Sequence, residues 1–316
     1  MEQVRVGMKA KKILITPRSL SKSGHPQLAR LTEAGYELLF PFPGKQPSEE
    51  ELLSVIGECS GYLAGVEKVS KRVLDSAPLL KVISRNGVGL DNVDLVSAKE
   101  HGIEVLGTPG ANSQGVAELA LTLALSSARG VVEGSNSIKN GGWKRSKGME
   151  IQNKTLGIIG CGNIGQRLAS MAIGIGMRVV GYDLYQADVL KGLEGFTFIP
   201  METLLASSDI ISLHCPPEDK PLVDKRFLEQ VKKGVIIINT ARSPLVDSDA
   251  MFRALEEDVV LHYAVDAFDS EPPALNRLLL HERVTLSPHI GGFTEESIQR
   301  ATSSAVTNIL TILKDK

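Results

Sequence analysis

Short apolar segments alternate with helical segments along most of the 316-residue chain. In the first third, the apolar segments 12–16, 36–41, 61–65 and 80–85 are each separated from the next by a segment with helical periodicity. Strands that are apolar throughout and are joined by helices are typical of a parallel sheet covered on both faces. The chain is too long for one ordinary core, so the pattern predicts two doubly wound α/β domains in tandem.

The alternation is interrupted in the middle of the chain. Residues 112–130 are predicted to form one long apolar helix, and the polar stretch 140–154, which holds the only tryptophan, Trp143, is predicted to be a loop. The alternation resumes at Lys154, and residues 294–314 have the apolar spacing of a final helix.

Composition excludes several classes of function. The formal net charge of −2 favours neither a nucleic-acid partner nor a membrane partner. The three cysteines, Cys59, Cys161 and Cys215, have no zinc-binding spacing and predict no disulfide, which suits a cytoplasmic protein without a metal. The first twelve residues lack the apolar core of a signal peptide, and the longest apolar run, 119–125, is too short to cross a bilayer.

A glycine motif gives the first indication of chemistry. Gly160, Gly162 and Gly165 have G-x-G-x-x-G spacing between an apolar strand and a helix, and Asp183 ends the next strand, 18 residues after Gly165. This is the dinucleotide-binding pattern, in which a pyrophosphate lies at the helix N-terminus and the acid accepts hydrogen bonds from a ribose. A carboxylate at position 183 repels a 2′-phosphate, so the motif favours NAD over NADP.

Three polar loops follow predicted strands in the second half. They carry Arg242, then Asp266 and Glu271, and then His289. Because a dinucleotide-binding fold places its substrate at the carboxyl ends of its strands, these side chains are expected to converge. Arg242 offers a planar fork for a carboxylate, His289 exchanges a proton near neutral pH, and Glu271 favours and orients the charged imidazolium.

Together these motifs resemble the D-isomer-specific 2-hydroxyacid dehydrogenase family. The resemblance extends over nearly the whole chain and rests on SRNGVGLDNVDL, TPGANSQGVAELALTL, TLGIIGCGNIGQRLA, HCPP, NTARSPLVD, DAFDSEPP and SPHIGG. It implies that Arg242 binds the carboxylate and carbonyl of a 2-oxo acid, that His289 is the acid/base and that Glu271 is its partner. It also implies that Asp266 lies near the nicotinamide carboxamide.

The resemblance further implies the remaining site residues. The implied substrate-binding residues are Arg85, Asn86, Gly87, Val88, Gly89, Arg242 and His289. The implied cofactor-binding residues are Gly160, Gly162, Asn163, Ile164, Gly165, Asp183, His214, Cys215, Pro216, Thr240, Ala241, Arg242, Asp266, His289 and Gly291.

The family also implies how the domains are organised. A flavodoxin-like substrate-binding domain would comprise residues 1–107 and be completed by residues 291–316. A Rossmann NAD-binding domain, residues 108–290, would be inserted into it. The long helix after Asn112 would build a homodimer interface.

The substrate is left open between related acids. Among subfamilies the chain looks most like short phosphoglycerate dehydrogenases. Arg18, Lys68 and Arg85 lie in or near predicted strand-end loops and could hold a phosphate, although Arg18 and Lys68 fit solvated surface charges at least as well. A glyoxylate or hydroxypyruvate reductase is the alternative within the class. A corepressor-like protein that responds to NAD(H) is the alternative from another class, and turnover of a simple 2-oxo acid would distinguish it.

Overall fold

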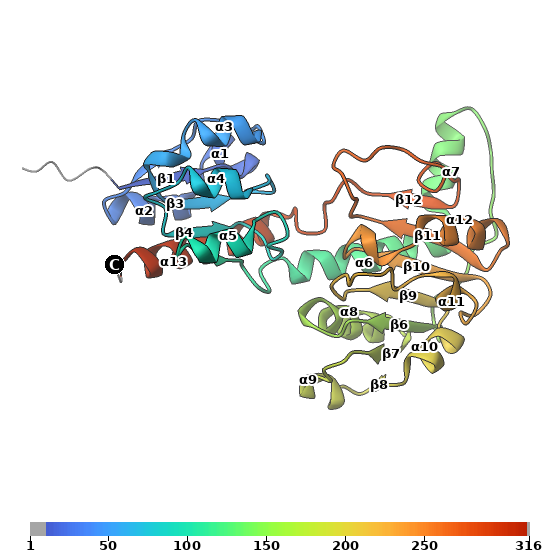
Figure 1. Ribbon diagram of the computed structural model, residues 1–316. Helices are drawn as coiled ribbons and strands as arrows, with labels where there is room; N and C mark the ends of the chain where they lie inside the picture. The colour runs from blue at the N-terminus through green and yellow to red at the C-terminus, as the bar shows by residue number, and fades with distance from the viewer. Residues whose placement is uncertain (1–10, 315–316) are drawn as a thin grey trace, which may run out of the picture. The chain divides into compact units, whose positions relative to one another are not determined.

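A computed structural model describes residues 11–314 of the chain, in two compact units (Figure 1). Unit 1 holds the residues up to Asn112 and those from Glu295 onward, and unit 2 runs from Ser113 to Thr294. The sequence prediction put these boundaries after residues 107 and 290. Most of the segment predicted to lack a signal peptide lies outside the described residues.

Unit 1 is built on a five-stranded parallel sheet in the order β2-β1-β3-β4-β5, which is the flavodoxin-type order. Its strands are β1 (Lys12–Ile15), β2 (Glu37–Leu39), β3 (Cys59–Ala64), β4 (Val82–Arg85) and β5 (Glu104–Leu106). Its helices are α1 (Arg18–Ser23), α2 (Ala29–Glu33), α3 (Glu49–Leu53), α4 (Lys71–Asp75), α5 (Leu95–Glu100) and α13 (Glu295–Lys314), with the 3-10 turns η1 (Pro26–Leu28) and η2 (Ile56–Glu58).

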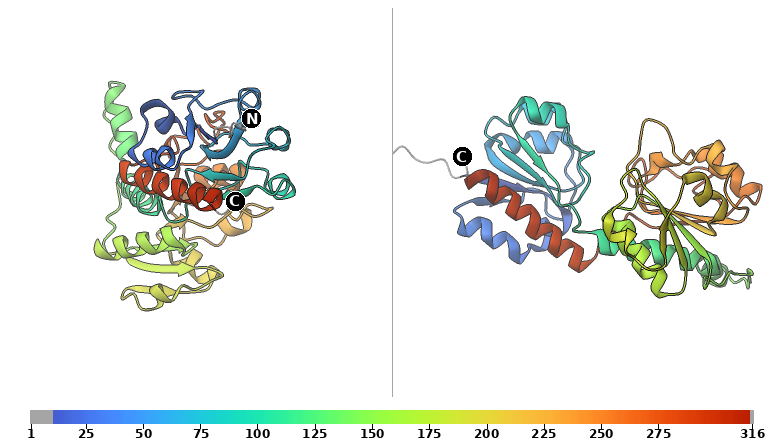
Figure 2. Two further views of the ribbon diagram at one scale, coloured as in Figure 1. Left: turned by 90° about the vertical axis from the view of Figure 1, so that its left-hand side faces the viewer. Right: turned by 90° about the horizontal axis from the view of Figure 1, so that it is seen from below.

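Both faces of this sheet are buried, as its continuous apolar strands predict. Successive side chains of a strand point to opposite faces. Ile13 and Ile15 accordingly pack with the buried face of α13, while Leu14 packs on the other side of the sheet. The C-terminal helix α13 lies along unit 1 in both views of Figure 2. It therefore belongs to the core of the unit that contains the N-terminal strands.

The polar residues at the helix starts in unit 1 act as caps. Ser48 and Glu51 form a capping box at the start of α3. Ser70 and Asp94 accept backbone N–H groups at the starts of α4 and α5. The helical segment before β2 begins with the 3-10 turn η1 and continues as α2.

Unit 2 is built on a seven-stranded parallel sheet in the order β12-β11-β10-β9-β6-β7-β8, the Rossmann order with one further strand. Its strands are β6 (Thr155–Ile159), β7 (Arg178–Tyr182), β8 (Phe196–Phe198), β9 (Ile210–Leu213), β10 (Val235–Asn239), β11 (Val260–Val265) and β12 (Val284–Leu286). Its helices are α6 (Ser113–Arg129), α7 (Val131–Lys139), α8 (Asn163–Gly174), α9 (Asp188–Lys191), α10 (Met201–Ser207), α11 (Lys225–Leu228) and α12 (Ser248–Glu256), with the 3-10 turn η3 (Ser243–Leu245).

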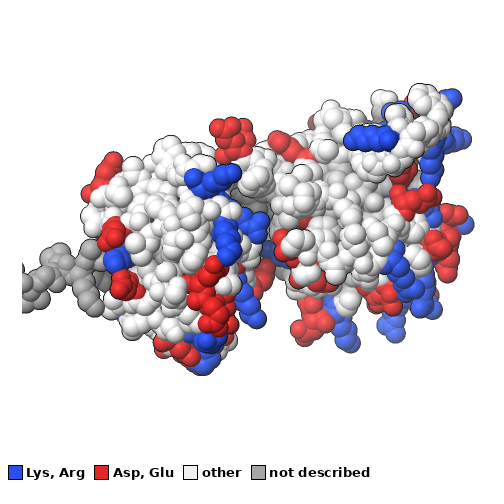
Figure 3. Space-filling view, turned by 90° about the horizontal axis from the view of Figure 1, so that it is seen from above, with Lys and Arg blue, Asp and Glu red and all other residues white. Residues whose placement is uncertain are grey.

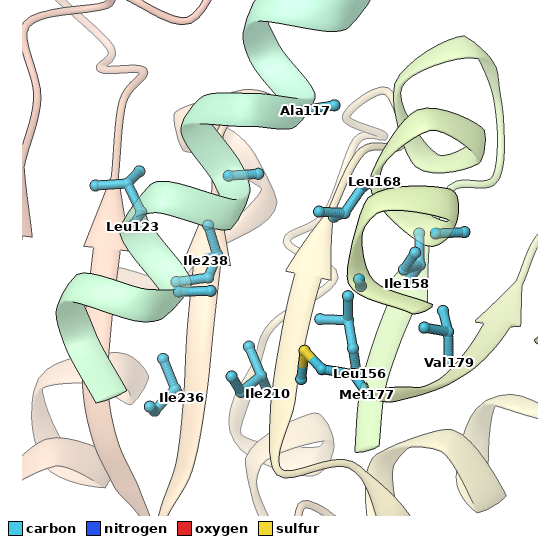
Figure 4. Close-up of a cluster of buried hydrophobic side chains, with 14 of the residues drawn as sticks. Ala117, Leu123, Leu156, Ile158, Leu168, Met177, Val179, Ile210, Ile236 and Ile238 are labelled. Atoms are coloured by element: carbon cyan, nitrogen blue, oxygen red, sulfur yellow. The ribbon is translucent and has the colours of Figure 1, made fainter. Parts of the chain in front are cut away.

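The long helix α6 covers one face of this sheet. Figure 4 shows Leu123 of α6 on the same side as Ile236 and Ile238 of β10, in one buried cluster. The alternate residues Val235 and Ile237 of β10 face a second cluster on the opposite side. The prediction of two doubly wound α/β domains is therefore confirmed.

Four short elements escaped the sequence prediction: α1, α7, α9 and β8. The longest of them, α7, has no buried residue, so it lacks the apolar stripe that marks a helix against a core. Among the described residues, no single helix meets the length and hydropathy of a membrane span. The bent pair of α6 and α7 meets them only when the two helices are joined.

The charged side chains of the surface are mixed. On the face drawn in Figure 3, Lys and Arg are interspersed with Asp and Glu, in keeping with the small net charge.

Candidate active site

The glycine motif forms the turn between β6 and α8. Gly160 has φ 93°, and a Cβ atom on it would lie 2.5 Å from the backbone of His214 and Cys215. A Cβ on Gly165 would lie 2.4 Å from the carbonyl oxygen of Gly160, whereas nothing lies within 4 Å of one on Gly162. The motif thus allows a tight turn and close helix packing, and leaves open space beside Gly162.

Helix α8 begins at Asn163 and Ile164 directly after this turn. Its N-cap residue is Gly162, so no side chain caps the helix. The first N–H groups of a helix have no partner within the helix, and the helix dipole favours an anion there. This end of α8 suits the pyrophosphate of a dinucleotide.

Asp183 follows β7 and lies against the glycine turn. Its Oδ2 accepts a hydrogen bond from the Cys161 N–H at 2.6 Å, and its Oδ1 accepts one from the Tyr185 N–H at 2.9 Å. Each carboxylate oxygen can accept more than one hydrogen bond. The half-buried carboxylate is therefore oriented by the backbone and keeps acceptor capacity for a ribose hydroxyl.

The ends of β9 and β10 hold buried polar atoms without protein partners. His214 Nε2 lies 2.8 Å from Ser212 Oγ, but its buried Nδ1 has no partner among the described residues. Burial lowers the pKa of His214 to about 4, so the ring is neutral at pH 7. Thr240 Oγ1, after β10, is likewise buried without a described partner. Buried polar atoms are normally hydrogen-bonded, so these atoms fit a site completed by a ligand.

Two other cofactor residues implied by the resemblance lie in the same place. Cys215 and Pro216 continue the chain from His214, directly beyond β9. Burial raises the pKa of the Cys215 thiol to about 11, so the thiol is protonated at neutral pH.

Asn239, the last residue of β10, holds the loop that carries Arg242. Its Nδ2 donates to the Arg242 carbonyl oxygen at 2.9 Å, and its Oδ1 accepts from the Ala241 N–H at 3.1 Å. The Arg242 side chain is half-buried, and its Nη1 donates to the Ala241 carbonyl oxygen at 2.8 Å. Asn239 was not among the predicted site residues, although a polar residue that ends an apolar strand is a usable signal.

Asp266, directly after β11, holds the loop that carries His289. The buried carboxylate accepts hydrogen bonds from Ser287 Oγ at 2.6 Å and from the N–H groups of Ile290 and Gly291, both at 2.9 Å. His289 has φ 51°, in the left-handed region that residues other than glycine rarely adopt. Asp266 thus secures both sides of a residue in an uncommon backbone conformation.

The structure brings Glu271 and His289 together. Glu271 Oε1 lies 2.6 Å from His289 Nδ1, and the two side chains are 38% and 43% exposed. The carboxylate accepts a hydrogen bond, so Nδ1 carries a proton and Nε2 is the ring nitrogen available to another molecule.

The predicted substrate loop of unit 1, residues 85–89, begins at Arg85, the last residue of β4. Arg85 Nε donates to Asn92 Oδ1 at 3.3 Å, and the guanidinium lies across Gly87, where a Cβ would meet Arg85 Nη1 at 1.8 Å. Within residues 11–314, the N–H groups of Gly87, Val88 and Gly89 donate to no protein acceptor. The loop therefore presents consecutive N–H groups, an arrangement that binds anions.

Comparisons with known proteins place the chain in a family. Residues 121–291 match the family model described as D-isomer specific 2-hydroxyacid dehydrogenase, NAD binding domain. The chain is 37% identical to hydroxypyruvate reductase of Thermotoga maritima over 83% of this chain and 87% of that protein. It is 34% identical to glyoxylate reductase of Thermococcus litoralis over 96% and 94% of the two chains.

Two further likenesses complete the comparison. The chain is 37% identical to D-3-phosphoglycerate dehydrogenase of Methanocaldococcus jannaschii over 84% of its own length, and spans only 52% of that protein. The crystal structure of a protein from Thermus thermophilus superimposes with a TM-score of 0.86, at 34% identity over 96% of this chain and 97% of that one.

These matches define a nicotinamide-dependent oxidoreductase. The chain belongs to the D-isomer specific 2-hydroxyacid dehydrogenase family, which confirms the resemblance. Its cofactor is NAD, bound by the domain that contains residues 121–291.

Proposed function

We propose that the chain interconverts a short D-2-hydroxy acid and its 2-oxo acid, with His289 as the acid and base and Glu271 as its partner. The observation that supports this most directly is the 2.6 Å contact between His289 Nδ1 and Glu271 Oε1. A carboxylate on Nδ1 fixes the ring and leaves Nε2 to exchange a proton with the substrate oxygen. His289 then donates a proton to the new hydroxyl in reduction and accepts it in oxidation.

The substrate carboxylate is bound, in this proposal, by Arg242 and by the loop Arg85–Gly89. The guanidinium of Arg242 has the planar fork that pairs with a carboxylate, and Asn239 holds its backbone in place. The N–H groups of Gly87, Val88 and Gly89 supply donors to the same charge.

The cofactor site is proposed to be the glycine turn with the strand ends beside it. Bound NAD(H) supplies or accepts the hydride. The N-terminus of α8 binds the pyrophosphate, and Asp183 binds the ribose and disfavours a 2′-phosphate. Asp266 is proposed to lie near the nicotinamide carboxamide, as in the family. The further cofactor contacts proposed are Gly160, Gly162, Asn163, Ile164, Gly165, His214, Cys215, Pro216, Thr240, Ala241, Arg242, His289 and Gly291.

The candidate substrates are glyoxylate, hydroxypyruvate and 3-phosphohydroxypyruvate. The first two are named in the matched reductases, and the third is the 2-oxo acid that corresponds to 3-phosphoglycerate. Near full-length similarity to a hydroxypyruvate reductase and a glyoxylate reductase supports the unphosphorylated acids. Of the residues predicted to hold a phosphate, Lys68 is exposed, and Arg18 is exposed and donates to Gln46 Oε1 at 2.7 Å.

The domain bounds, the cellular location and the oligomeric state of the chain are also proposed. Residues 1–107 and 291–316 form the substrate-binding domain, and residues 108–290 form the NAD-binding domain. The proposed cytoplasmic location rests on the free cysteines Cys59, Cys161 and Cys215. The proposed homodimer interface is the long helix α6, and the exposed apolar residues that follow it, Val131, Ile138 and Trp143 at 57%, 58% and 77%, support a partner there. Light scattering at micromolar concentration should give the mass of two chains.

The test is a panel of 2-oxo acids followed by NADH absorbance. We expect turnover of at least one of the three acids, and loss of about 10²–10⁴-fold in kcat for His289→Ala with NADH binding retained. The matched control is His281→Ala, because His281 also pairs with a glutamate, Glu256, at 3.0 Å. No turnover of any acid by a chain that binds NADH would support the corepressor-like alternative instead.

A further inference from the structure

Unit 1 contains a buried carboxylate to which the proposed mechanism gives no task. Glu67 follows β3 and is only 2% exposed. Its Oε1 accepts hydrogen bonds from Tyr62 Oη at 2.6 Å, from the Gly65 N–H at 2.8 Å and from Thr16 Oγ1. Burying a charged group costs free energy unless the group is paired or hydrogen-bonded, so a glutamate in this buried position is a candidate for a functional role.

The three groups around Glu67 Oε1 are all hydrogen-bond donors. Burial and the neighbouring Glu67 carboxylate raise the pKa of Tyr62 well above its ordinary value, so the phenol remains a donor. All three partners donate to Oε1, which suits a carboxylate. Among residues 11–314, no Lys or Arg forms an ion pair with Glu67. The carboxyl group of Glu67 is thus hydrogen-bonded but has no cationic partner among these residues.

Glu67 is tied to the substrate loop by hydrogen bonds. Ala64, at the end of β3, pairs with Arg85 across the sheet, and its carbonyl oxygen accepts the Asn86 N–H at 2.8 Å. Asn92 Nδ2 donates to the Glu67 carbonyl oxygen at 2.7 Å, while Asn92 Oδ1 accepts from Arg85 Nε. The turn that carries Glu67 and the loop that carries Arg85 therefore lie at the same carboxyl edge.

The Glu67 side chain also fills space at this edge. A Cβ atom on Gly65 would lie 2.7 Å from Glu67 Oε2 and 3.2 Å from Pro17 Cα. The buried Glu67 carboxylate therefore occupies the space that a side chain at position 65 would need.

We propose that Glu67 is a specificity-determining residue that excludes a second anionic group from the substrate. The inference rests on the proposed function, and it names the substrate as a 2-oxo acid with one negative charge, such as hydroxypyruvate. Arg85 and the N–H groups of its loop serve one carboxylate, and the buried charge of Glu67 offsets the positive field around them. A phosphate at this edge would be repelled by a charge that solvent and salt screen poorly.

The experiment compares kcat/KM for hydroxypyruvate and 3-phosphohydroxypyruvate, which differ only by the phosphate. We expect the wild-type protein to prefer hydroxypyruvate by about tenfold or more. Glu67→Gln keeps the size of the side chain and its acceptor oxygen while removing the charge. In this variant the ratio should move toward the phosphorylated acid by about tenfold, with hydroxypyruvate turnover nearly unchanged. Glu33→Gln, which removes an exposed charge at the end of α2, should leave the ratio as in the wild type.

Other results would contradict either the specificity role of Glu67 or the proposed function. A wild-type preference for the phosphorylated acid, or an unchanged ratio in Glu67→Gln, overturns the specificity role. A Glu67→Gln protein that binds NADH but reduces neither acid makes Glu67 a structural residue and also overturns it. If this variant does not fold, the same ratio of kcat/KM values is measured for Glu67→Met, which has a similar volume and no charge. A wild-type protein that reduces no 2-oxo acid overturns the proposed function, and the inference with it.

Discussion

Replacing Glu271 by glutamine should slow the oxidation of the hydroxy acid while leaving the fold intact. When His289 accepts the substrate proton, a positive charge develops 2.6 Å from the Glu271 carboxylate. The two side chains are 43% and 38% exposed, so water is the appropriate medium. Coulomb's law with a dielectric constant of about 80 then gives about 1.6 kcal/mol. A glutamine oxygen still accepts the Nδ1 hydrogen bond, so the variant removes this charge term alone, and kcat for oxidation should fall about 15-fold.

The same exposure predicts little effect on stability. A solvent-exposed ion pair contributes about 0–1 kcal/mol, which corresponds to a shift in Tm of about 4 °C or less. Steady-state kinetics and thermal melting on one preparation measure both quantities. The reasoning is refuted by full oxidation activity in Glu271→Gln, or by a rate loss that merely follows a large drop in Tm. Glu256→Gln, which alters the His281 pair, is the control and should keep its activity.

Three further results are expected. Arg242→Lys should raise KM for the oxo acid and lower kcat, because lysine cannot form two parallel bonds to a carboxylate. Equal weakening of NADH binding in titrations would move Arg242 to the cofactor site. Asp183→Ser should weaken NAD binding by about 2 kcal/mol and admit NADP, so an unaltered cofactor preference in kinetics would exclude Asp183 as the ribose ligand. Because burial lowers the pKa of His214 to about 4, the unfolded chain gains a proton there as the pH falls below about 6.5, whereas the folded chain does not. Unfolding in urea should therefore cost about 2 kcal/mol less from His214 alone at pH 5 than at pH 7, and His214→Gln should lose this component. An identical pH dependence in the variant would contradict the assignment.

The fold was predictable because its main signal is local. Strands such as β9 and β10 are buried along their whole length, so nearly all of their residues are apolar, as expected for a parallel sheet between helices. The glycine turn was predictable for a related reason. Its residues are adjacent in sequence, and two of its glycines, Gly160 and Gly165, are required by the backbone atoms that lie close to them.

Features with no local signal were missed. Helix α7 buries no residue, and α9 and β8 are four and three residues long, so none of them shows a readable period. Glu67 reads in the sequence as one surface acid among many. Its burial depends on Thr16, 51 positions away, and no pattern in the sequence links the two.

Asp266 shows why the site depends on such distant contacts. His289 occupies a backbone region that costs about 1–3 kcal/mol for a residue other than glycine, and it holds that conformation only because its surroundings fix it. This conformation is held by Asp266, directly after β11. Its buried carboxylate accepts hydrogen bonds from Ser287, Ile290 and Gly291, on both sides of His289. Hydrogen bonds to a charged group contribute about 1.5–3 kcal/mol each, enough together to outweigh the strain. Asn239 does the same for Arg242 from the neighbouring strand β10. Arg242 and His289 are thus each held by a buried polar residue at the end of a strand of unit 2, so the order of the sheet extends to two side chains proposed to meet the substrate.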